Sequence, residues 1–218
     1  MSRPLREHHN LNIVPKVSLV RNLYTLEMSG KRLFITGIPT AGKSHLANRL
    51  AEKVGGLHVL GDSICDELKK ESEEYRKWID FYWDQDEHTY YTTTSHEQQW
   101  INLVAQAEHV WPGILEHIKK YDNEEKPVIF DGVLVLPHLA KRDLAFPGVV
   151  LVGKSLEETL ARNKLEPRWG DTEELQKLEA ESFFYCERPR YIEEAQKYGY
   201  PVFEEPEAAY SSALELLQ

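Results

Sequence analysis

Eight residues in the first quarter of the chain, Gly37-Ile-Pro-Thr-Ala-Gly42-Lys43-Ser44, constrain its fold more than any other segment. They match the pattern G-x-x-x-x-G-K-[ST], follow an apolar run at 33–36 and precede a helical stretch at 45–53. In this strand–loop–helix context, glycines let the backbone bend so that successive N–H groups and the helix N-terminus face a phosphate. The sequence therefore predicts a nucleotide-binding loop after the first strand of a sheet.

The loop supplies the contacts expected for a nucleotide and its metal ion. Lys43 is expected to reach the β- and γ-phosphates, and the Ser44 hydroxyl is expected to bind Mg²⁺. A glycine-rich turn that only caps a helix would leave the Lys43-Ser44 pair unexplained. The residues expected to contact the nucleotide are Gly37, Ile38, Pro39, Thr40, Ala41, Gly42, Lys43, Ser44 and His45.

The chain has the size of one domain and a strong acidic balance. Its 218 residues suffice for a core without disulfides or structural zinc, for which two cysteines are too few. A formal net charge of −10 repels nucleic acid phosphates and anionic lipid. No apolar run approaches the roughly 20 residues of a membrane span, and the first thirty residues lack the apolar core of a secretory signal. We therefore expect a cytoplasmic protein with no membrane or nucleic-acid partner. The sequence does not indicate the oligomeric state.

From residue 31 onward, short apolar runs alternate with longer amphipathic stretches, which is the pattern of β-α-β units and a parallel sheet. Ser155 with Glu158, and Asp171 with Glu174, predict capping-box starts for two helices. Residues 1–30 show no sustained period and are expected to form an N-terminal extension, either an appended tail or the product of a misassigned start. Strands are predicted at 32–36, 57–60, 127–130, 149–152 and 201–203, and helices at 43–54, 63–83, 96–120, 155–164, 172–197 and 206–217.

The loop and its flanking elements resemble the P-loop kinases of small molecules, a family that includes nucleoside monophosphate, gluconate, shikimate and 2-phosphoglycerate kinases. The resemblance covers residues 31 to about 204, and the Lys43 motif is its most specific part. It implies a P-loop kinase domain at 31–218, built as a three-layer α/β sandwich with a five-stranded parallel sheet of order 2-3-1-4-5. It also implies ATP and Mg²⁺, an acceptor-binding insertion at about 62–126, and a helical lid at about 162–191 that carries arginines.

Two aspartates follow predicted strands, Asp62 after the second and Asp131 after the third. Ligands of parallel α/β sheets bind beyond the carboxyl ends of strands, so both should face the phosphate loop, one orienting the acceptor hydroxyl and one holding Mg²⁺. Asp62 resembles the acceptor-binding aspartate of small-molecule kinases, and Asp131-Gly132 is similar to the third strand of 2-phosphoglycerate kinases. Because the third strand of this fold lies beside the first, Asp131 is expected nearer to Mg²⁺. The simpler interpretation makes Asp62 a helix cap and Asp131 a turn residue, and which one is the base stays open.

The most basic stretch of the chain contains Arg162, Arg168, Arg188 and Arg190. The order Arg168-Trp-Gly-Asp171 resembles the lid of nucleotide kinases, in which arginines neutralise charge on the transferred phosphoryl group. We expect Arg162 and Arg168 to act in this way. The alternative is a set of surface ion pairs with neighbouring acids such as Glu187. Pro189 is expected to interrupt the helix near the end of this stretch.

The segment at 75–91 carries seven aromatic side chains interleaved with acidic ones. Aromatic rings beside polar groups suit a flat acceptor that stacks on one face and hydrogen-bonds at its edge. Tyr75, Trp78 and Tyr82 recur at helical spacing, however, so packing explains part of the segment. Asp84, Asp86 and His88 form a weak metal pattern that a solvated acidic face explains as well.

The sequence thus predicts an ATP-dependent phosphotransferase, a kinase that transfers the γ-phosphoryl group to a nucleotide, sugar or phosphorylated metabolite. A GTP-dependent switch would need an N-K-x-D motif after a strand, whereas Asn163-Lys-Leu-Glu166 ends a predicted helix. A nucleic-acid end kinase shares the loop and the aspartate but conflicts with the acidic charge. A P-loop regulatory protein that binds nucleotide without transfer also stays open.

Overall fold

Five parallel strands form one sheet in the order β2-β3-β1-β4-β5, as predicted. The structure is a computed structural model and describes residues 32–217. Ile35 in the central strand pairs with Asp131 on one side and Val149 on the other. This register places the carboxyl end of the third strand beside the start of the phosphate loop. The strands are β1 (Arg32–Gly37), β2 (Leu57–Leu60), β3 (Val128–Asp131), β4 (Gly148–Leu151) and β5 (Val202–Phe203).

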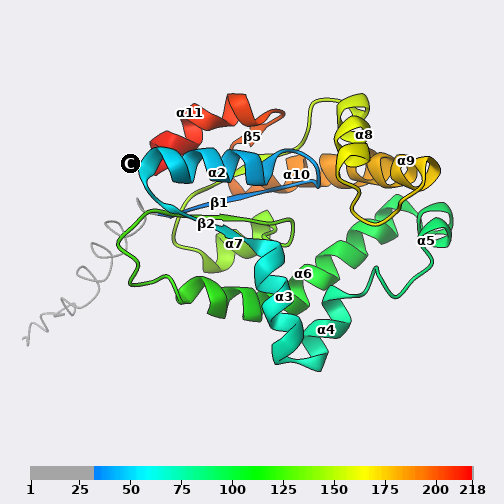
Figure 1. Cartoon of the computed structure of the whole chain (residues 1–218), viewed down its shortest axis with the longest axis horizontal. Coiled ribbons are helices and arrows are strands. Elements are labelled where there is room, and N and C mark those ends of the chain that lie inside the picture. The colour runs from blue at the N-terminus through cyan, green and yellow to red at the C-terminus, as the bar shows by residue number, and fades with distance from the viewer. Residues whose placement is uncertain (1–31, 218) are drawn as a thin grey trace, which may run out of the picture.

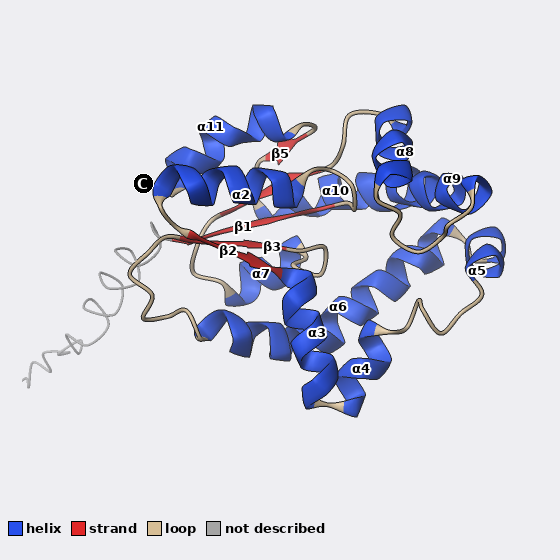
Figure 2. Cartoon of the chain, in the orientation of Figure 1, coloured by secondary structure: helices blue, strands red, loops and turns tan. Residues whose placement is uncertain are grey.

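Helices cover both faces of the sheet, so the fold is the predicted three-layer α/β sandwich (Figure 1). On one face, α2 (Lys43–Val54) packs beside α11 (Pro206–Leu216), and on the other α7 (Pro137–Asp143) packs against α10 (Arg188–Tyr198). Figure 2 shows the other helices extending away from the sheet. They are α3 (Gly61–Glu71), α4 (Glu73–Ile79), α5 (Glu87–Thr93), α6 (His96–Lys119), α8 (Leu156–Leu165) and α9 (Glu173–Glu181).

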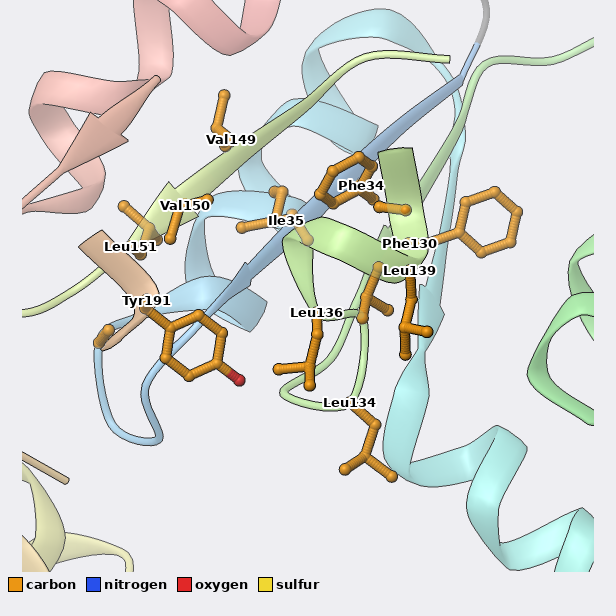
Figure 3. Packing of buried hydrophobic residues seen from close by; sticks show 14 of the residues in the cluster. Phe34, Ile35, Phe130, Leu134, Leu136, Leu139, Val149, Val150, Leu151 and Tyr191 are labelled. Atoms are coloured by element: carbon orange, nitrogen blue, oxygen red, sulfur yellow. The ribbon is translucent and has the colours of Figure 1, made fainter. Parts of the chain in front are cut away.

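The core lies between the sheet and the helices on each face. Phe34 and Ile35 of β1 are fully buried, because a parallel strand covered on both faces reads as a continuous apolar run. Figure 3 shows both side chains on the central strand, and Leu136, which precedes α7, and Tyr191 of α10 belong to the same buried cluster. The Tyr191 hydroxyl donates a 2.5 Å hydrogen bond to the Val133 carbonyl, which satisfies a buried polar group. The core thereby fixes the segment that follows β3.

Two local predictions are wrong, and two short helices are not predicted. The helix predicted at 63–83 breaks at Ser72, whose backbone is extended and whose hydroxyl accepts from the Glu74 N–H, so that it caps α4. The N-cap of α9 is Thr172 instead of Asp171, and its hydroxyl accepts from the Leu175 N–H at 3.2 Å. The sequence patterns also do not predict the short helices α5 and α7. The predicted cap at Ser155 is confirmed by a 3.2 Å hydrogen bond from the Glu158 N–H.

The long helix predicted at 172–197 exists, but its middle is wider than an α-helix. The segment η1 (Ser182–Glu187) is π-helical and joins α9 to α10, and the Arg188 N–H reaches back five residues to the Phe183 carbonyl. Pro189 has no N–H, and its ring excludes a carbonyl at the α-helical position. The α-helix is therefore interrupted next to Pro189, as predicted, but the wide turn accommodates the proline and the chain stays helical. Turns of this kind occur frequently at functional sites.

Two further features concern the limits of the domain. The insertion predicted at about 62–126 corresponds to the four helices between β2 and β3. The predicted extension at 1–30 lies outside the described residues. Within 32–217, no helix combines the length and the apolar character needed to cross a membrane.

Candidate active site

The phosphate loop owes its shape to glycines with positive φ angles. Gly37 has φ +126°, and a Cβ atom there would lie 1.8 Å from the Leu151 carbonyl oxygen. Gly42, with φ +89°, directly precedes α2. Thr40 between them has φ +59°, a left-handed conformation that non-glycine residues rarely adopt outside functional loops. The loop therefore bends over the N-terminus of α2, where backbone N–H groups attract a phosphate.

Lys43 is the first residue of α2 and turns its side chain back into the loop. Its Nζ atom donates a 2.7 Å hydrogen bond to the Ile38 carbonyl, and the side chain is buried. Burial lowers the pKa of Lys43 to about 8, and the positive charge of Arg168 acts in the same direction. A nucleotide phosphate would supply the negative charge that this ammonium group needs.

Ser44 and Asp131 are in direct contact at the junction of the loop and β3. The Ser44 hydroxyl donates a 2.6 Å hydrogen bond to Asp131 Oδ2, and His58 Nε2 at β2 lies 3.3 Å from Oδ1. Asn48 Oδ1 of α2 lies 2.8 Å from the other nitrogen of His58. Burial alone would raise the pKa of Asp131, but the contacts with His58 and Ser44 outweigh it and keep that pKa below its ordinary value. Asp131 is therefore a carboxylate at neutral pH.

Asp62 occupies the first turn of α3. The helix begins at Gly61, so Asp62 is not its N-cap. Arg168, in the loop before α9, lies 3.3 Å from the Asp62 carboxylate, and the pair joins the insertion to the predicted lid. Both side chains are exposed, so this ion pair contributes little stability and can open when a ligand arrives.

The four arginines of the basic stretch divide into two groups. Arg162 of α8 donates a 3.2 Å hydrogen bond to the Thr40 carbonyl and therefore lies against the phosphate loop. Arg168 lines the cavity described below. Arg188 and Arg190 form ion pairs with glutamates away from this cavity, which matches the alternative interpretation for these two. His45 is exposed on α2, and Pro39 lines the cavity.

A cavity of about 370 Å³ opens between the phosphate loop and the helical insertion. Asp62, Asp131, Arg168 and Glu187 of η1 are among the residues that line it. Its volume is within the range of small-molecule sites. The aromatic residues that line it are Tyr82, Trp83, Tyr90, Tyr91, Phe130, Trp169 and Phe183.

The aromatic segment serves both packing and the cavity. Trp78 stacks on His109 of α6, with ring centroids 3.8 Å apart, and it packs against the core. Tyr82 and Tyr91 instead surround Trp169 of the predicted lid, with centroids 6.2 and 5.7 Å from its own. The acceptor-stacking hypothesis therefore concerns only the second group. This group also connects the insertion to the loop that carries Arg168.

Two buried glutamates hold the backbone of that loop. Glu179 of α9 accepts a 2.7 Å hydrogen bond from the Asn163 side chain, and its carboxylate faces the backbone of Arg168 and Trp169. Glu87 of α5 packs its carboxylate against Gly170, where a Cβ atom would lie 2.7 Å from either oxygen. Burial raises the pKa of Glu179, and it raises the pKa of Glu87 to about 7. Neither glutamate can be picked out from the sequence, because its role depends on its contact with this loop in the folded protein.

Glu187 is the main residue that the sequence patterns miss. It ends η1, lines the cavity, and its Oε2 atom is buried without a hydrogen-bond partner. Burial raises the pKa of Glu187 to about 8, against the opposing charge of Lys43. From sequence, Glu187 fits a surface ion pair with a nearby arginine, and the structure contradicts this. The only available signal is Pro189, which marks an irregular helical turn just after it.

The residues around Ser44 fit a magnesium ion. Ser44 and Asp131 offer oxygen atoms, which Mg²⁺ prefers, and Asp131 is ionised. No group of three or more His, Cys, Asp or Glu side chains within 32–217 is arranged to hold a metal by itself. An ion here would thus depend on nucleotide phosphates for further ligands. Of the weak pattern at 84–88, Asp86 serves as the N-cap of α5.

The sheet order, the loop and the Ser44–Asp131 contact together define a P-loop fold. Among solved structures, a gluconokinase from Sinorhizobium meliloti 1021 matches with a TM-score of 0.42 and 16% identity, covering 87% of this chain and 92% of its own. A deoxyadenosine kinase from M. mycoides with bound dATP matches with a TM-score of 0.44 and 17% identity, covering 86% and 96%.

An uncharacterized protein from Eubacterium ventriosum ATCC 27560 matches with a TM-score of 0.42 and 9% identity, covering 85% of this chain and 97% of its own. A scan against protein-family models and a search of curated proteins find no match. Two of these three solved structures are kinases, the group that the sequence resembles. TM-scores this low do not transfer a function, so the function is argued from the site.

Proposed function

We propose that the chain is an ATP-dependent phosphotransferase that transfers the γ-phosphoryl group of ATP to a hydroxyl group of a small molecule. One observation carries the proposal: Asp131 both accepts the hydrogen bond of Ser44 in the phosphate loop and lines the cavity. A nucleotide in the loop would therefore direct its last phosphate toward the cavity. A second substrate of small-molecule size fits there.

In the proposed reaction, the acceptor oxygen attacks the γ-phosphorus while the bond to the β,γ-bridging oxygen breaks. The products are ADP and a phosphorylated acceptor, and the hydroxyl proton passes to a carboxylate of the cavity, for which Asp62 is the candidate. Lys43, Arg162 and Arg168 neutralise the charge on the phosphoryl group. The segment at 162–191, which carries both arginines, would be the lid of the site. Ser44 and Asp131 would hold Mg²⁺, which neutralises phosphate charge when bound.

The direct test incubates the protein with ATP, Mg²⁺ and a panel of hydroxylated metabolites and measures product masses. The expected result is one compound that gains the mass of one phosphoryl group, at a rate that falls at least about a hundredfold in Lys43→Ala. Nucleotide binding and hydrolysis without any phosphorylated compound would instead indicate a regulatory P-loop protein. The net charge of −10 supports a small acceptor over an oligonucleotide.

A further inference from the structure

The acceptor cavity has an unusual charge for a kinase that would act on phosphorylated metabolites. Five carboxylate residues line it, against only two basic residues. Both basic groups already have partners, because Lys69 lies 2.6 Å from Asp80 and Arg168 lies 3.3 Å from Asp62. An anionic acceptor would enter a cavity in which acidic residues outnumber basic ones, and a lining cation could bind it only by leaving its present partner.

Most polar groups deep in the cavity are already engaged within the protein. Gln99 accepts a 2.7 Å hydrogen bond from Ser182, and Gln106 donates a 2.9 Å hydrogen bond to the Trp78 carbonyl. Glu179 holds the loop that carries Arg168, as described above. Glu187 differs, because one of its oxygens is buried without a partner. An unpartnered buried acceptor is destabilising, and a ligand that donates a hydrogen bond to it would remove that cost.

The shape of the cavity adds a second constraint. Tyr82, Trp83 and Tyr91 reach it from the insertion, and Trp169 reaches it from the predicted lid. These rings meet edge to face, with Trp83 and Trp169 centroids 6.0 Å apart, and they form an aromatic wall. Aromatic walls favour ring-bearing ligands, and they also attract cations.

We propose that the acceptor is an unphosphorylated, neutral or cationic molecule with a flat ring, which packs against this aromatic wall and donates an O–H or N–H hydrogen bond to Glu187. The proposal rests on the phosphotransferase function proposed above and specifies its substrate class. It replaces the broader expectation of a nucleotide, sugar or phosphorylated metabolite. Glu187 selects the acceptor in this account, and the reacting hydroxyl lies nearer to Asp62 and Asp131.

Matched acceptors that differ by one phosphate test the charge of the substrate. The neutral or cationic arm contains adenosine, cytidine, pyridoxine and thiamine, and the anionic arm contains the corresponding monophosphates together with 3-phosphoglycerate. Phosphorylation and calorimetric binding are measured with ATP or a non-hydrolysable analogue present. The expected result is a kcat/KM or affinity at least tenfold higher for a member of the first arm than for its phosphorylated counterpart. A preference for the anionic arm, or no binding in either arm, overturns the proposal.

The variant Glu187→Gln tests the contact itself. It should lower kcat/KM for the best acceptor at least tenfold while the KM for ATP and the melting temperature do not fall. Glu181→Gln, on the same helix but outside the cavity, is the matched control and should change none of these values. A fall in melting temperature without a change in acceptor kcat/KM would assign Glu187 a structural role.

The same measurements separate this proposal from the proposed function. If the protein phosphorylates only anionic acceptors through Lys43, the phosphotransferase function stands and the substrate class is wrong. If ATP neither binds nor reacts, the proposed function itself fails. Acceptor binding that is insensitive to Glu187→Gln would retain the function and contradict the assigned contact.

Discussion

The Ser44 hydroxyl donates a 2.6 Å hydrogen bond to Asp131 Oδ2, which joins two parts of the chain 87 residues apart. Ser44 belongs to the phosphate loop, and Asp131 ends the strand beside it. Each residue alone is a weak indication of function, because serine is an ordinary helix residue and aspartate commonly precedes a glycine turn. Their contact, made by a carboxylate that also lines the cavity, is what supports a shared magnesium site.

The two strand-end aspartates should have separable roles. Asp131→Asn should depress both acceptor phosphorylation and background ATP hydrolysis, because metal and phosphoryl positioning serve both reactions. Asp62→Asn should suppress transfer to the acceptor while slow hydrolysis and ATP affinity persist, since Asp62 lies on α3 and its ion-pair partner is Arg168 instead of a phosphate-loop residue. Steady-state assays of ADP and of phosphorylated product distinguish the two. A reversed pattern would exchange the roles, and a loss below about tenfold in both variants would exclude either as the essential base.

Lys43→Ala should abolish turnover without unfolding the protein. In the proposed reaction the lysine stabilises the transferred phosphoryl group, so we expect a loss of at least about a hundredfold, or roughly 2.7 kcal/mol of barrier. The buried ammonium group already carries a desolvation cost, so its removal should lower the melting temperature by no more than a few degrees. An assay of ADP formation measures the turnover of the variant, and scanning calorimetry measures its melting temperature. Wild-type turnover in a folded variant would remove the phosphate loop from the mechanism.

Arg168→Ala should slow phosphoryl transfer roughly tenfold or more without a measurable loss of stability. The side chain lines the cavity, and its ion pair with Asp62 is exposed and therefore weak. Arg190→Ala is the matched control, because Arg190 also forms exposed ion pairs but lies outside the cavity. Rapid-quench kinetics should separate the two variants, and equal rates would place Arg168 outside the reaction.

Gly37→Ala should destabilise the protein by roughly 3 kcal/mol or more. The new Cβ atom would lie 1.8 Å from a backbone oxygen at a φ of +126°, so the loop or β4 has to move. Gly199→Ala is a useful comparison, since Gly199 also has a positive φ but open space around it, and it should cost only about 1 kcal/mol. Urea unfolding measures the difference, and equal costs would mean that the loop geometry is wrong.

Glu187→Gln should stabilise the ligand-free protein more at pH 8 than at pH 5. Burial raises the pKa of Glu187 from 4.5 to about 8, with Lys43 lowering it and Glu179 raising it. Between these pH values the folded protein retains a proton that the unfolded chain releases, so wild-type stability falls as pH rises. Glutamine avoids that loss, so the free energy of unfolding of the variant should exceed that of the wild type by roughly 1–3 kcal/mol at pH 8. Urea titrations at pH 5, 6.5 and 8 measure this difference. The same difference in free energy of unfolding at all three pH values would contradict the burial of the Glu187 carboxylate.

Much of the fold is predictable because its signals are local. The apolar runs of β1 and β4 identify buried parallel strands, and the Lys43 motif fixes the helix that follows β1. The order of the strands in the sheet cannot be predicted from local patterns. It is predicted from the resemblance of the Lys43 motif and its flanking elements to P-loop kinases of small molecules. Ser72 shows the limit, since a polar residue within an amphipathic stretch gives no clear sign that it will end one helix and cap the next.

The site is predictable where a local motif or a strand end carries it. Asp62 and Asp131 are found because parallel strands end at one edge of the sheet, and the structure places both at the cavity. Glu187 is not found, because its burial depends on η1 meeting the insertion, a contact between distant segments. The role of Glu87 is hidden for the same reason, since it packs against a loop far away in sequence, and that of Glu179 depends on how the loop before α9 folds back toward this helix.

The most direct test of phosphoryl transfer follows the γ-phosphoryl group of ATP itself. ATP labelled with ¹⁸O in its γ-phosphoryl group is incubated with the protein, Mg²⁺ and the best-binding acceptor, and the products are examined by ³¹P NMR and mass spectrometry. The account predicts that the label appears in a phosphate ester of the acceptor and that Lys43→Ala forms none. Label found only in inorganic phosphate, at a rate independent of the acceptor, would contradict it.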